Sequence, residues 1–433
     1  MLKKRNIYFK STIYLIIGGF ITRSLGFIIK IIYSRILKDE GIGLLTIVMP
    51  TYSILLTITS LALPIALSKL VAENKKRFVK LMSNSTIIVL IVNFLVIILM
   101  IIFSDFIANN LLHEPRCKGL LIAMSFTFPF VSASSIIKGY FNGKQRTLPY
   151  MISNVLEQLL RLIIIIIVIP ILYQKSVYLA VKGLLLMSII SEIFSIVVFM
   201  FFIPKNVKID LKTLKPDFET QKDILNIAIP TVSGRVIGNI GYFLEPIILT
   251  NLLLLMGYSN EYIIMEYGFY NAYSLSLLTM PLFFIAAISN TIIPEISKYR
   301  ELRNDFMVKR RIKQSLLSVF LVGVFFSIII IIFRIPLLKL LYNTTNGANY
   351  ILILAPFFAL FYLESVLYSV LQASGFAKKA MTISLNGVIV KLLSMSLLCL
   401  LKTGMYSLVI AEIINILTVV FLNFKTIKKE KLI

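Results

Sequence analysis

The sequence has no tryptophan, one histidine and two cysteines among its 433 residues, and only 15% of its residues are charged. Cys117 and Cys399 fall in separate segments, which argues against a disulfide framework or a cysteine metal cage. His113 is most simply a solvated loop residue, and no His, Cys and Asp cluster indicates a metal site or a nucleophile. These absences predict a chain that is not an enzyme and that needs no cofactor and no metal.

A nucleotide site is also missing. The run Gly139-x-x-x-Gly143-Lys144 is one residue shorter than a phosphate-binding loop and lacks the Ser or Thr that should follow. ATP therefore cannot drive this chain directly. No cleavable signal peptide is evident, because the first apolar run has the length of a membrane span and no small-residue cleavage site.

Apolar residues dominate what is present. The sequence is 58% hydrophobic, whereas soluble domains are near half apolar and a quarter charged. The fold class is therefore predicted to be an all-α polytopic membrane protein. About twelve segments have the length of a membrane span: Thr12–Ile32, Leu44–Leu67, Ser85–Phe103, Leu120–Ile137, Met151–Tyr173, Leu179–Ile203, Ile224–Leu249, Tyr267–Ile293, Ser315–Phe333, Ile351–Leu371, Met381–Leu401 and Tyr406–Phe424.

The net charge of +24 does not indicate a nucleic-acid partner. The distribution of the basic residues instead predicts how the chain is oriented in the membrane. Basic residues gather in the cytoplasmic loops of membrane proteins. With both termini in the cytoplasm, the inner segments hold about 30 of the 44 basic residues and the outer loops about 8. Two cytoplasmic termini require an even number of spans, which agrees with twelve.

Short repeated motifs predict two lobes. The turn Gly143-Lys144-Gln145-Arg146 has a counterpart in residues 375–379, and Arg23-x-x-Gly26 has one in Arg235-x-x-Gly238. In both cases the two copies of the motif occupy the same place in the order of spans within the two halves of the chain. We therefore expect an N-terminal six-helix lobe (1–209), a polar cytoplasmic connector (210–223) and a C-terminal six-helix lobe (224–433). Parallel repeats of this kind are a known transporter plan, with the substrate site between the lobes.

Deep polar side chains mark the candidate binding site. Arg23 and Arg235 each lie about 15 Å from a membrane surface, which is further than an arginine side chain can reach by snorkelling. A mid-membrane charge should face a cavity or a partner. Lys30 shares the helical face of Arg23, and Asn239 shares that of Arg235.

A second polar stripe lies in the fifth span. Asn154, Glu157 and Arg161 are spaced by three and four residues and so share one helical face. Glu157 and Arg161 can neutralise each other along the helix, which is a structural alternative to binding. The deep arginines also have a structural alternative, in which they pair with buried carboxylates. The candidate partners are Glu157, Glu192, Glu245, Glu364 and Glu412.

Four runs in the first 165 residues resemble the stage V sporulation protein B family: Lys138–Gln145 with Val155–Gln158, Thr22–Phe27, Glu40–Leu44 and Leu63–Glu73. This family belongs to the multidrug/oligosaccharidyl-lipid/polysaccharide flippase superfamily. The resemblance implies two V-shaped lobes, alternating access, a lipid-linked saccharide as cargo and a role in spore cortex peptidoglycan. It also implies the bacterial cytoplasmic membrane as the location. The related lipid II flippases carry further arginines where this sequence has Ile29 and Ile54, and they often have fourteen helices.

The function predicted first is a flippase for a saccharide linked to a lipid pyrophosphate, which would make that substrate and membrane lipid its partners. Enzymes of envelope synthesis are further candidate partners. The predicted substrate-binding residues are those on the polar stripes together with one deep glutamate: Arg23, Arg235, Lys30, Asn239, Glu245, Asn154, Glu157 and Arg161. A cation-coupled multidrug antiporter of the same superfamily and a non-transporting scaffold of the envelope machinery remain as alternatives.

Overall fold

The computed structural model describes residues 2–73, 78–203, 215–430 and 432, and their regular elements are all helices. The chain divides into two compact units, Met1–Phe243 (unit 1) and Leu244–Ile433 (unit 2). The predicted lobe boundary at 210–223 stays a prediction, and its residues 210–214 lie outside the described residues.

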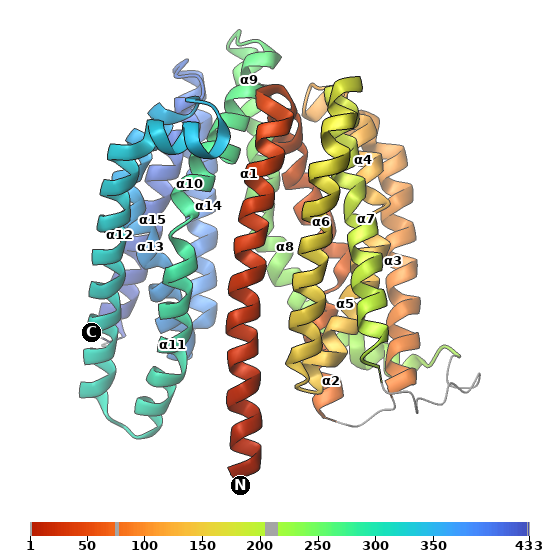
Figure 1. Ribbon diagram of the computed structural model, residues 1–433. Coiled ribbons are helices and arrows are strands. Elements are labelled where there is room, and N and C mark those ends of the chain that lie inside the picture. The colour runs from red at the N-terminus through yellow and green to blue at the C-terminus, as the bar shows by residue number, and fades with distance from the viewer. Residues whose placement is uncertain (1, 74–77, 204–214, 431, 433) are drawn as a thin grey trace. The chain divides into compact units, whose positions relative to one another are not determined.

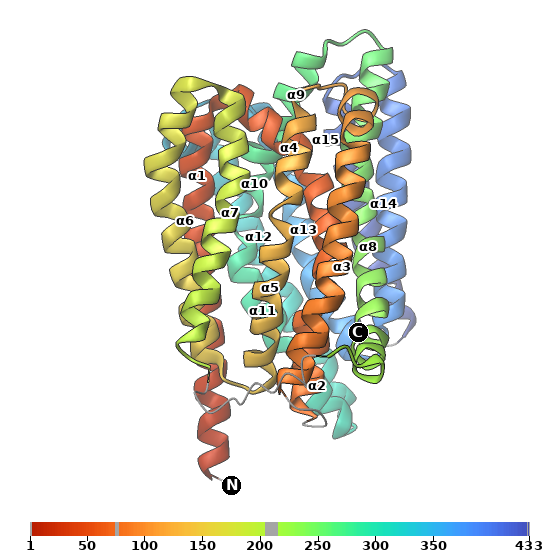
Figure 2. The ribbon, with the colours of Figure 1, turned by 90° about the vertical axis from the view of Figure 1, so that its right-hand side faces the viewer.

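Unit 1 is built from seven helices and the first part of an eighth, with a π-helical turn after α3 (Figures 1 and 2). Long apolar runs bounded by polar residues form these helices. Their bounds are α1 (Leu2–Ser60), α2 (Leu63–Ala72), α3 (Phe78–Phe106), α4 (Cys117–Ser125), α5 (Phe128–Gly143), α6 (Thr147–Lys175), α7 (Val177–Met200) and α8 (Phe218–Leu255).

Unit 2 continues with α9 (Asn260–Gly268), a π-helical turn (Phe269–Ser274), α10 (Leu275–Thr279), α11 (Leu282–Glu301), α12 (Asp305–Tyr342), α13 (Ala348–Ala373), α14 (Ala377–Leu400) and α15 (Tyr406–Lys429). Helix α13 contacts α11, α12, α14 and α15 and therefore forms the core of this unit. Its Phe358 and Tyr362 are fully buried.

By length and composition, ten described helices can cross a membrane, or eleven if a bent pair counts as one span. That pair, α9–α10 with α11, bends by 51° near Pro281. The predicted number of twelve is not reproduced by this count. Most of the first predicted span and all of the second fall in one helical stretch, Ile17–Ala72, whose backbone is non-helical at Lys38 (φ 53°). Figure 1 shows α1 turning back on itself. The internal repeat stays a prediction.

Close packing explains the glycine pair in α5. A Cβ atom at Gly143 would lie 2.7 Å from the Ser68 carbonyl oxygen, and one at Gly139 would lie 3.1 Å from Pro64 Cα. Small residues four apart allow two membrane helices to approach closely. The run Gly139-x-x-x-Gly143, which resembles an incomplete phosphate-binding loop, is thus the surface on which α5 packs against α2.

Asp217 fixes the start of α8 against α3. Its Oδ2 atom accepts a hydrogen bond from the Thr220 backbone N–H (2.9 Å) and lies 3.0 Å from Lys80 Nζ. Its own N–H donates to Asn84 Oδ1 at 2.8 Å. Hydrogen bonds from the Thr220 hydroxyl and from Lys80 lower the pKa of Asp217 to about 2. A carboxylate at this position is a stabilising N-cap.

Candidate functional site

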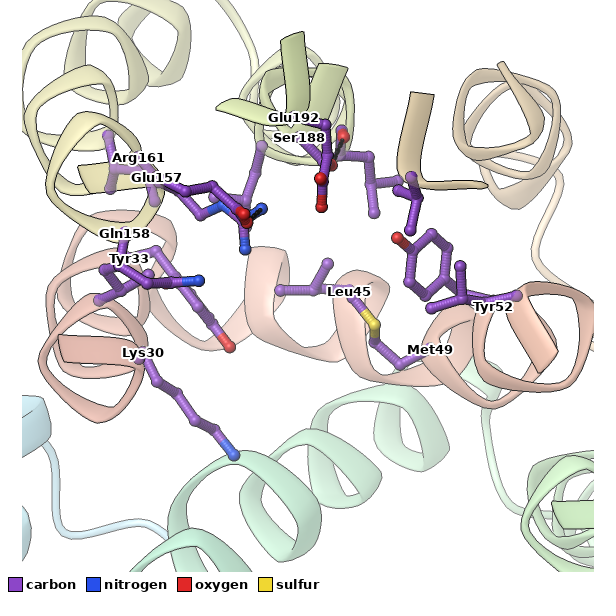
Figure 3. A pocket seen from close by; sticks show the side chains of 17 residues that line it. Lys30, Tyr33, Leu45, Met49, Tyr52, Glu157, Gln158, Arg161, Ser188 and Glu192 are labelled. Atoms are coloured by element: carbon purple, nitrogen blue, oxygen red, sulfur yellow. Dashed lines mark hydrogen bonds and ion pairs between the residues drawn. The ribbon is translucent and has the colours of Figure 1, made fainter. Parts of the chain in front are cut away.

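A cavity of about 470 Å³ lies in unit 1, where α1, α5, α6 and α7 line it (Figure 3). We call it the unit 1 cavity. One wall is apolar and includes Leu45 and Met49 of α1. The cavity is unusual for a membrane bundle, because many of its other lining side chains are polar or charged. These polar and charged residues are Lys30, Tyr33, Tyr52, Glu157, Gln158, Arg161, Ser188 and Glu192.

Helix α6 brings the predicted stripe to this cavity. Arg161 Nη2 lies 3.2 Å from Glu157 Oε1, so the predicted ion pair along the helix is confirmed. Its spacing of four residues aligns the two side chains on one face. The Arg161 guanidinium also donates to Ser191 Oγ of α7, at 3.0 Å from Nη2 and 3.3 Å from Nε. Arg161 is therefore held at the junction of α6 and α7.

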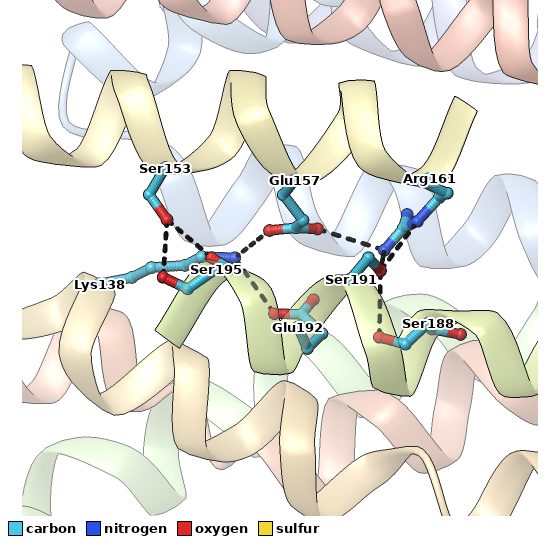
Figure 4. A network of polar contacts seen from close by, with 8 residues as sticks. All are labelled: Lys138, Ser153, Glu157, Arg161, Ser188, Ser191, Glu192 and Ser195. Atoms are coloured by element: carbon cyan, nitrogen blue, oxygen red, sulfur yellow. Dashed lines mark hydrogen bonds and ion pairs between the residues drawn. The ribbon is translucent and has the colours of Figure 1, made fainter. Parts of the chain in front are cut away.

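A buried network extends from this pair to α5 (Figure 4). Lys138 Nζ lies 3.1 Å from Glu157 Oε2 and 3.6 Å from Glu192 Oε2. Both carboxylates are buried. Ser153 of α6 and Ser195 of α7 add a hydroxyl pair at 2.8 Å. Burying a charge without a partner is strongly unfavourable, so these mutual contacts hold the three helices together.

Lys30 differs from the other charges of the unit 1 cavity. Within the described residues it has no hydrogen-bond or ion-pair partner, although it lines the cavity. In Figure 3 its amine points away from the Glu157–Arg161 pair, while Tyr33 and Tyr52 turn their hydroxyl groups inward. With Lys138 and Arg161, the cavity and its network hold three cations against two carboxylates. The arrangement carries a net positive charge and can bind an anion.

Arg23 and Asn154 lie together in a separate depression. It measures about 310 Å³ and is lined by α1 and α6. The Arg23 side chain is exposed, and within the described residues its guanidinium has no partner. A Cβ atom at Gly26, one turn further on, would meet nothing within 4 Å. The structure thus separates Arg23 from Lys30, which the sequence placed on one stripe.

Arg235 and Asn239 of α8 also lie in unit 1. Arg235 is exposed, and the position of a Cβ atom at Gly238 is open, as at Gly26. Asn239 Nδ2 donates a hydrogen bond to Thr57 Oγ1 at 3.0 Å, which ties α8 to α1. Four of the candidate carboxylate partners lie within ion-pair distance of a lysine, and the fifth, Glu364, has no ion pair among the described residues. No described carboxylate pairs with Arg23 or Arg235.

Glu245 belongs to unit 2, where its carboxylate already has two side-chain partners. Its Oε2 atom lies 2.6 Å from Lys391 Nζ, and its Oε1 atom accepts a hydrogen bond from the Tyr267 hydroxyl at 3.1 Å. Lys391 Nζ also lies 2.5 Å from Glu412 Oε2. A largely buried lysine between two glutamates, its side chain 15% exposed, therefore joins α8, α14 and α15. Within the part of the chain that is described, no group of three or more His, Cys, Asp or Glu could hold a metal ion.

Sequence reasoning missed Lys138, Tyr33, Tyr52 and Gln158 as parts of the site. Lys138 had a usable signal, since it is a lysine in a span-length apolar segment and needs a buried partner. The tyrosines gave none, because interfacial and cavity-lining tyrosines look alike in a sequence.

Comparisons with known proteins agree with this architecture. Residues 8–300 match the family model described as polysaccharide biosynthesis protein. Stage V sporulation protein B of Bacillus subtilis (strain 168) is 30% identical over 98% of this chain and 84% of its own length. The structure is similar to an inward-facing multidrug resistance MATE family transporter of the MOP superfamily, with a TM-score of 0.78, 14% identity and 94% of each chain covered.

A second solved structure, the lipid II flippase MurJ in an inward closed conformation, has a TM-score of 0.70 at 16% identity and covers 95% of this chain and 87% of its own. At sequence identities of 14% and 16%, the similarity to these two structures shows a shared fold alone. The matched model covers most of the chain, and the sporulation relative spans nearly all of it. The chain therefore belongs to the polysaccharide biosynthesis protein family, as a multi-pass membrane relative of stage V sporulation protein B with the fold of MOP superfamily transporters.

Proposed function

We propose that the chain is a flippase that moves a lipid-linked saccharide diphosphate, such as a peptidoglycan precursor, across the bacterial cytoplasmic membrane by alternating access. The description of the matching family model, polysaccharide biosynthesis protein, and the name of the lipid II flippase support this cargo class. On this proposal both termini are cytoplasmic, two six-helix lobes rock about the cargo, and the chain is a transporter with no catalytic step.

The observation that carries the proposal is the unpaired Lys30 in the unit 1 cavity, where no described residue pairs with it. A lone cation is costly inside a membrane unless water or an anion reaches it. Arg161 lies in the same cavity and can offer its guanidinium to phosphate oxygens. Tyr33, Tyr52 and Gln158 line the remainder with groups that can bond to sugar hydroxyls. The cavity thus suits an anionic, hydroxyl-rich headgroup.

The test is reconstitution in liposomes with a fluorescent lipid-linked diphosphate precursor, whose transfer is followed with an impermeant quencher. We expect Lys30→Gln to slow transfer about tenfold to a hundredfold, the effect of losing one charge-assisted hydrogen bond. Lys30→Arg should keep most of the rate. The matched control is Lys175→Gln, on an exposed side chain in the last turn of α6. Equal transfer by Lys30→Gln and the parent protein, at equal yield, contradicts the proposal.

Arg23 and Arg235 are proposed as further contacts for the diphosphate. Both are exposed and unpaired among the described residues, and each has an open glycine position one turn away. In the same assay Arg23→Lys should lose most transfer, because lysine cannot reproduce bidentate phosphate contacts. Asn154 shares the depression of Arg23 and would orient the same group.

A cation-coupled multidrug antiporter is the second candidate. Glu157 and Glu192 lie in the wall of the unit 1 cavity, and carboxylates bind organic cations. Their contacts with Lys138 and Arg161 favour the anionic cargo instead. Export of a fluorescent organic cation from the same liposomes, abolished by Glu192→Gln, would support the antiporter.

A further inference from the structure

A cavity of about 490 Å³ lies in unit 2, between the start of α14 and the end of α15. We call it the unit 2 cavity. Its lining includes Gly375, Phe376, Lys378, Lys379, Thr382 and Thr426. The two helices pack against each other directly. The cavity therefore lies at the end of the bundle where the chain enters α14 and leaves α15.

Positive charge dominates this cavity. Lys378 is exposed and, among the described residues, has no ion-pair partner. Lys379 Nζ lies 4.7 Å from the centre of the Phe376 ring and 2.5 Å from Glu430 Oε1. The first turn of α14 has no acidic residue, and the last turn of α15 carries Lys428 and Lys429. Glu430 is thus the acidic group that competes for this cluster.

An exposed stripe continues from the cavity along α14. Its residues are spaced by three or four and so lie on one helical face: Thr382, Asn386, Ile389, Leu393, Leu397 and Leu400. Ile389 is 54% exposed and Leu397 66%. Exposed side chains of this kind on a membrane helix suit acyl chains. A basic cavity at the foot of a stripe that is apolar from Ile389 onward has the two chemistries of an anionic phospholipid.

We propose that the unit 2 cavity binds the phosphate headgroup of an anionic phospholipid of the cytoplasmic leaflet, with its acyl chains along the nearer part of the α14 stripe, up to Ile389 and Leu393. Leu397 lies about 28 Å from Lys378 along the helix and therefore beyond the reach of one leaflet. Lys378 supplies the free cation, and Lys379 is shared between the headgroup and Glu430. Basic pockets between helices at the cytoplasmic surface attract such headgroups. The inference rests on the proposed orientation of the chain and is independent of the cargo.

The absence of tryptophan makes a direct test possible. Phe376→Trp places one fluorophore in the lining of the unit 2 cavity, and Leu397→Trp places one at the far end of the stripe. Each variant is reconstituted in vesicles of phosphatidylcholine and phosphatidylglycerol, with one of the two lipids brominated as a quencher. We expect brominated phosphatidylglycerol to quench the Phe376→Trp variant in preference to brominated phosphatidylcholine. Both lipids should quench the Leu397→Trp variant equally.

Charge variants in the Phe376→Trp background sharpen the test. Lys378→Gln should lower the preference about fivefold, the effect of one lysine near an anionic surface. Glu430→Gln should raise the preference, because it frees Lys379. Lys402→Gln is the matched control, since Lys402 is exposed just beyond the other end of α14.

Equal quenching of the Phe376→Trp variant by both lipids overturns the inference. A preference that survives Lys378→Gln, or that is equally strong in the Leu397→Trp variant, overturns it too, because the attraction would then be a general surface effect. Native mass spectrometry of the unsubstituted protein gives a second measurement, which the added fluorophore cannot disturb. Retention of phosphatidylglycerol over phosphatidylcholine there supports the site, and equal retention overturns it. Neither measurement depends on flipping, so failure of the proposed function leaves this result unchanged.

Discussion

Lys391 offers the sharpest test of how unit 2 is held together. Its ammonium lies 2.6 Å from Glu245 and 2.5 Å from Glu412, whose side chains are only 5% and 10% exposed. Lys391→Met removes the cation and leaves two carboxylates buried without it. Breaking a buried pair in this way costs about 3–5 kcal/mol, because the remaining charge stays desolvated. The folded-to-unfolded ratio should fall by a factor of about 100 to several thousand.

The assay is unfolding of the purified protein in mixed micelles of increasing SDS content, followed by circular dichroism. Glu245→Gln should cost less, about 1–3 kcal/mol, because Lys391 keeps Glu412 and the Tyr267 hydroxyl can still bond to the amide. The triple change Lys391→Met, Glu245→Gln and Glu412→Gln removes every charge of the group and should recover much of the loss. A Lys391→Met variant as stable as the parent, or no recovery in the triple variant, would refute the reasoning.

Two further predictions concern topology and pH. In a background lacking both native cysteines, a cysteine at Lys309 should resist an impermeant thiol reagent added outside, whereas one at Lys402 should react; the reverse pattern would invert the proposed orientation. The lowered pKa of Asp217 means that its capping bonds favour the folded state fully above about pH 4 and lose that effect as pH falls towards about 2. Hydrogen exchange of the Thr220 amide should therefore show growing fraying of the start of α8 over that range, and Asp217→Asn should abolish this pH dependence; an unchanged profile in the variant would contradict it.

Local patterns within one helix could be predicted from the sequence. The Glu157–Arg161 pair follows from a spacing of four residues, and the apolar runs coincide with the helices that are long enough to cross a membrane. Partners contributed by other helices could not be predicted. Lys138 reaches Glu157 and Glu192 only because α5, α6 and α7 pack together, and spacing within one helix carries no information about that packing.

Two other structural features could not be predicted from the sequence, each for a different reason. Lys38 adopts a positive φ without being glycine, so the break in α1 has no residue signal. Arg23 and Lys30 share a helical stripe, yet they line separate openings because α6 presents Asn154 at one level and Arg161 at another. Periodicity predicts which face a residue occupies and leaves open what lies opposite.

The Lys391 group also sets an order of events during synthesis. Glu245 lies in α8, and its cation arrives only with α14, after α9 to α13 have been made. Arg161, by contrast, follows Glu157 within about one turn of the same helix and can pair with it as soon as α6 forms. We therefore expect α6 to leave the insertion machinery early. Helix α8 should be retained beside that machinery until the last two helices of the chain reach it.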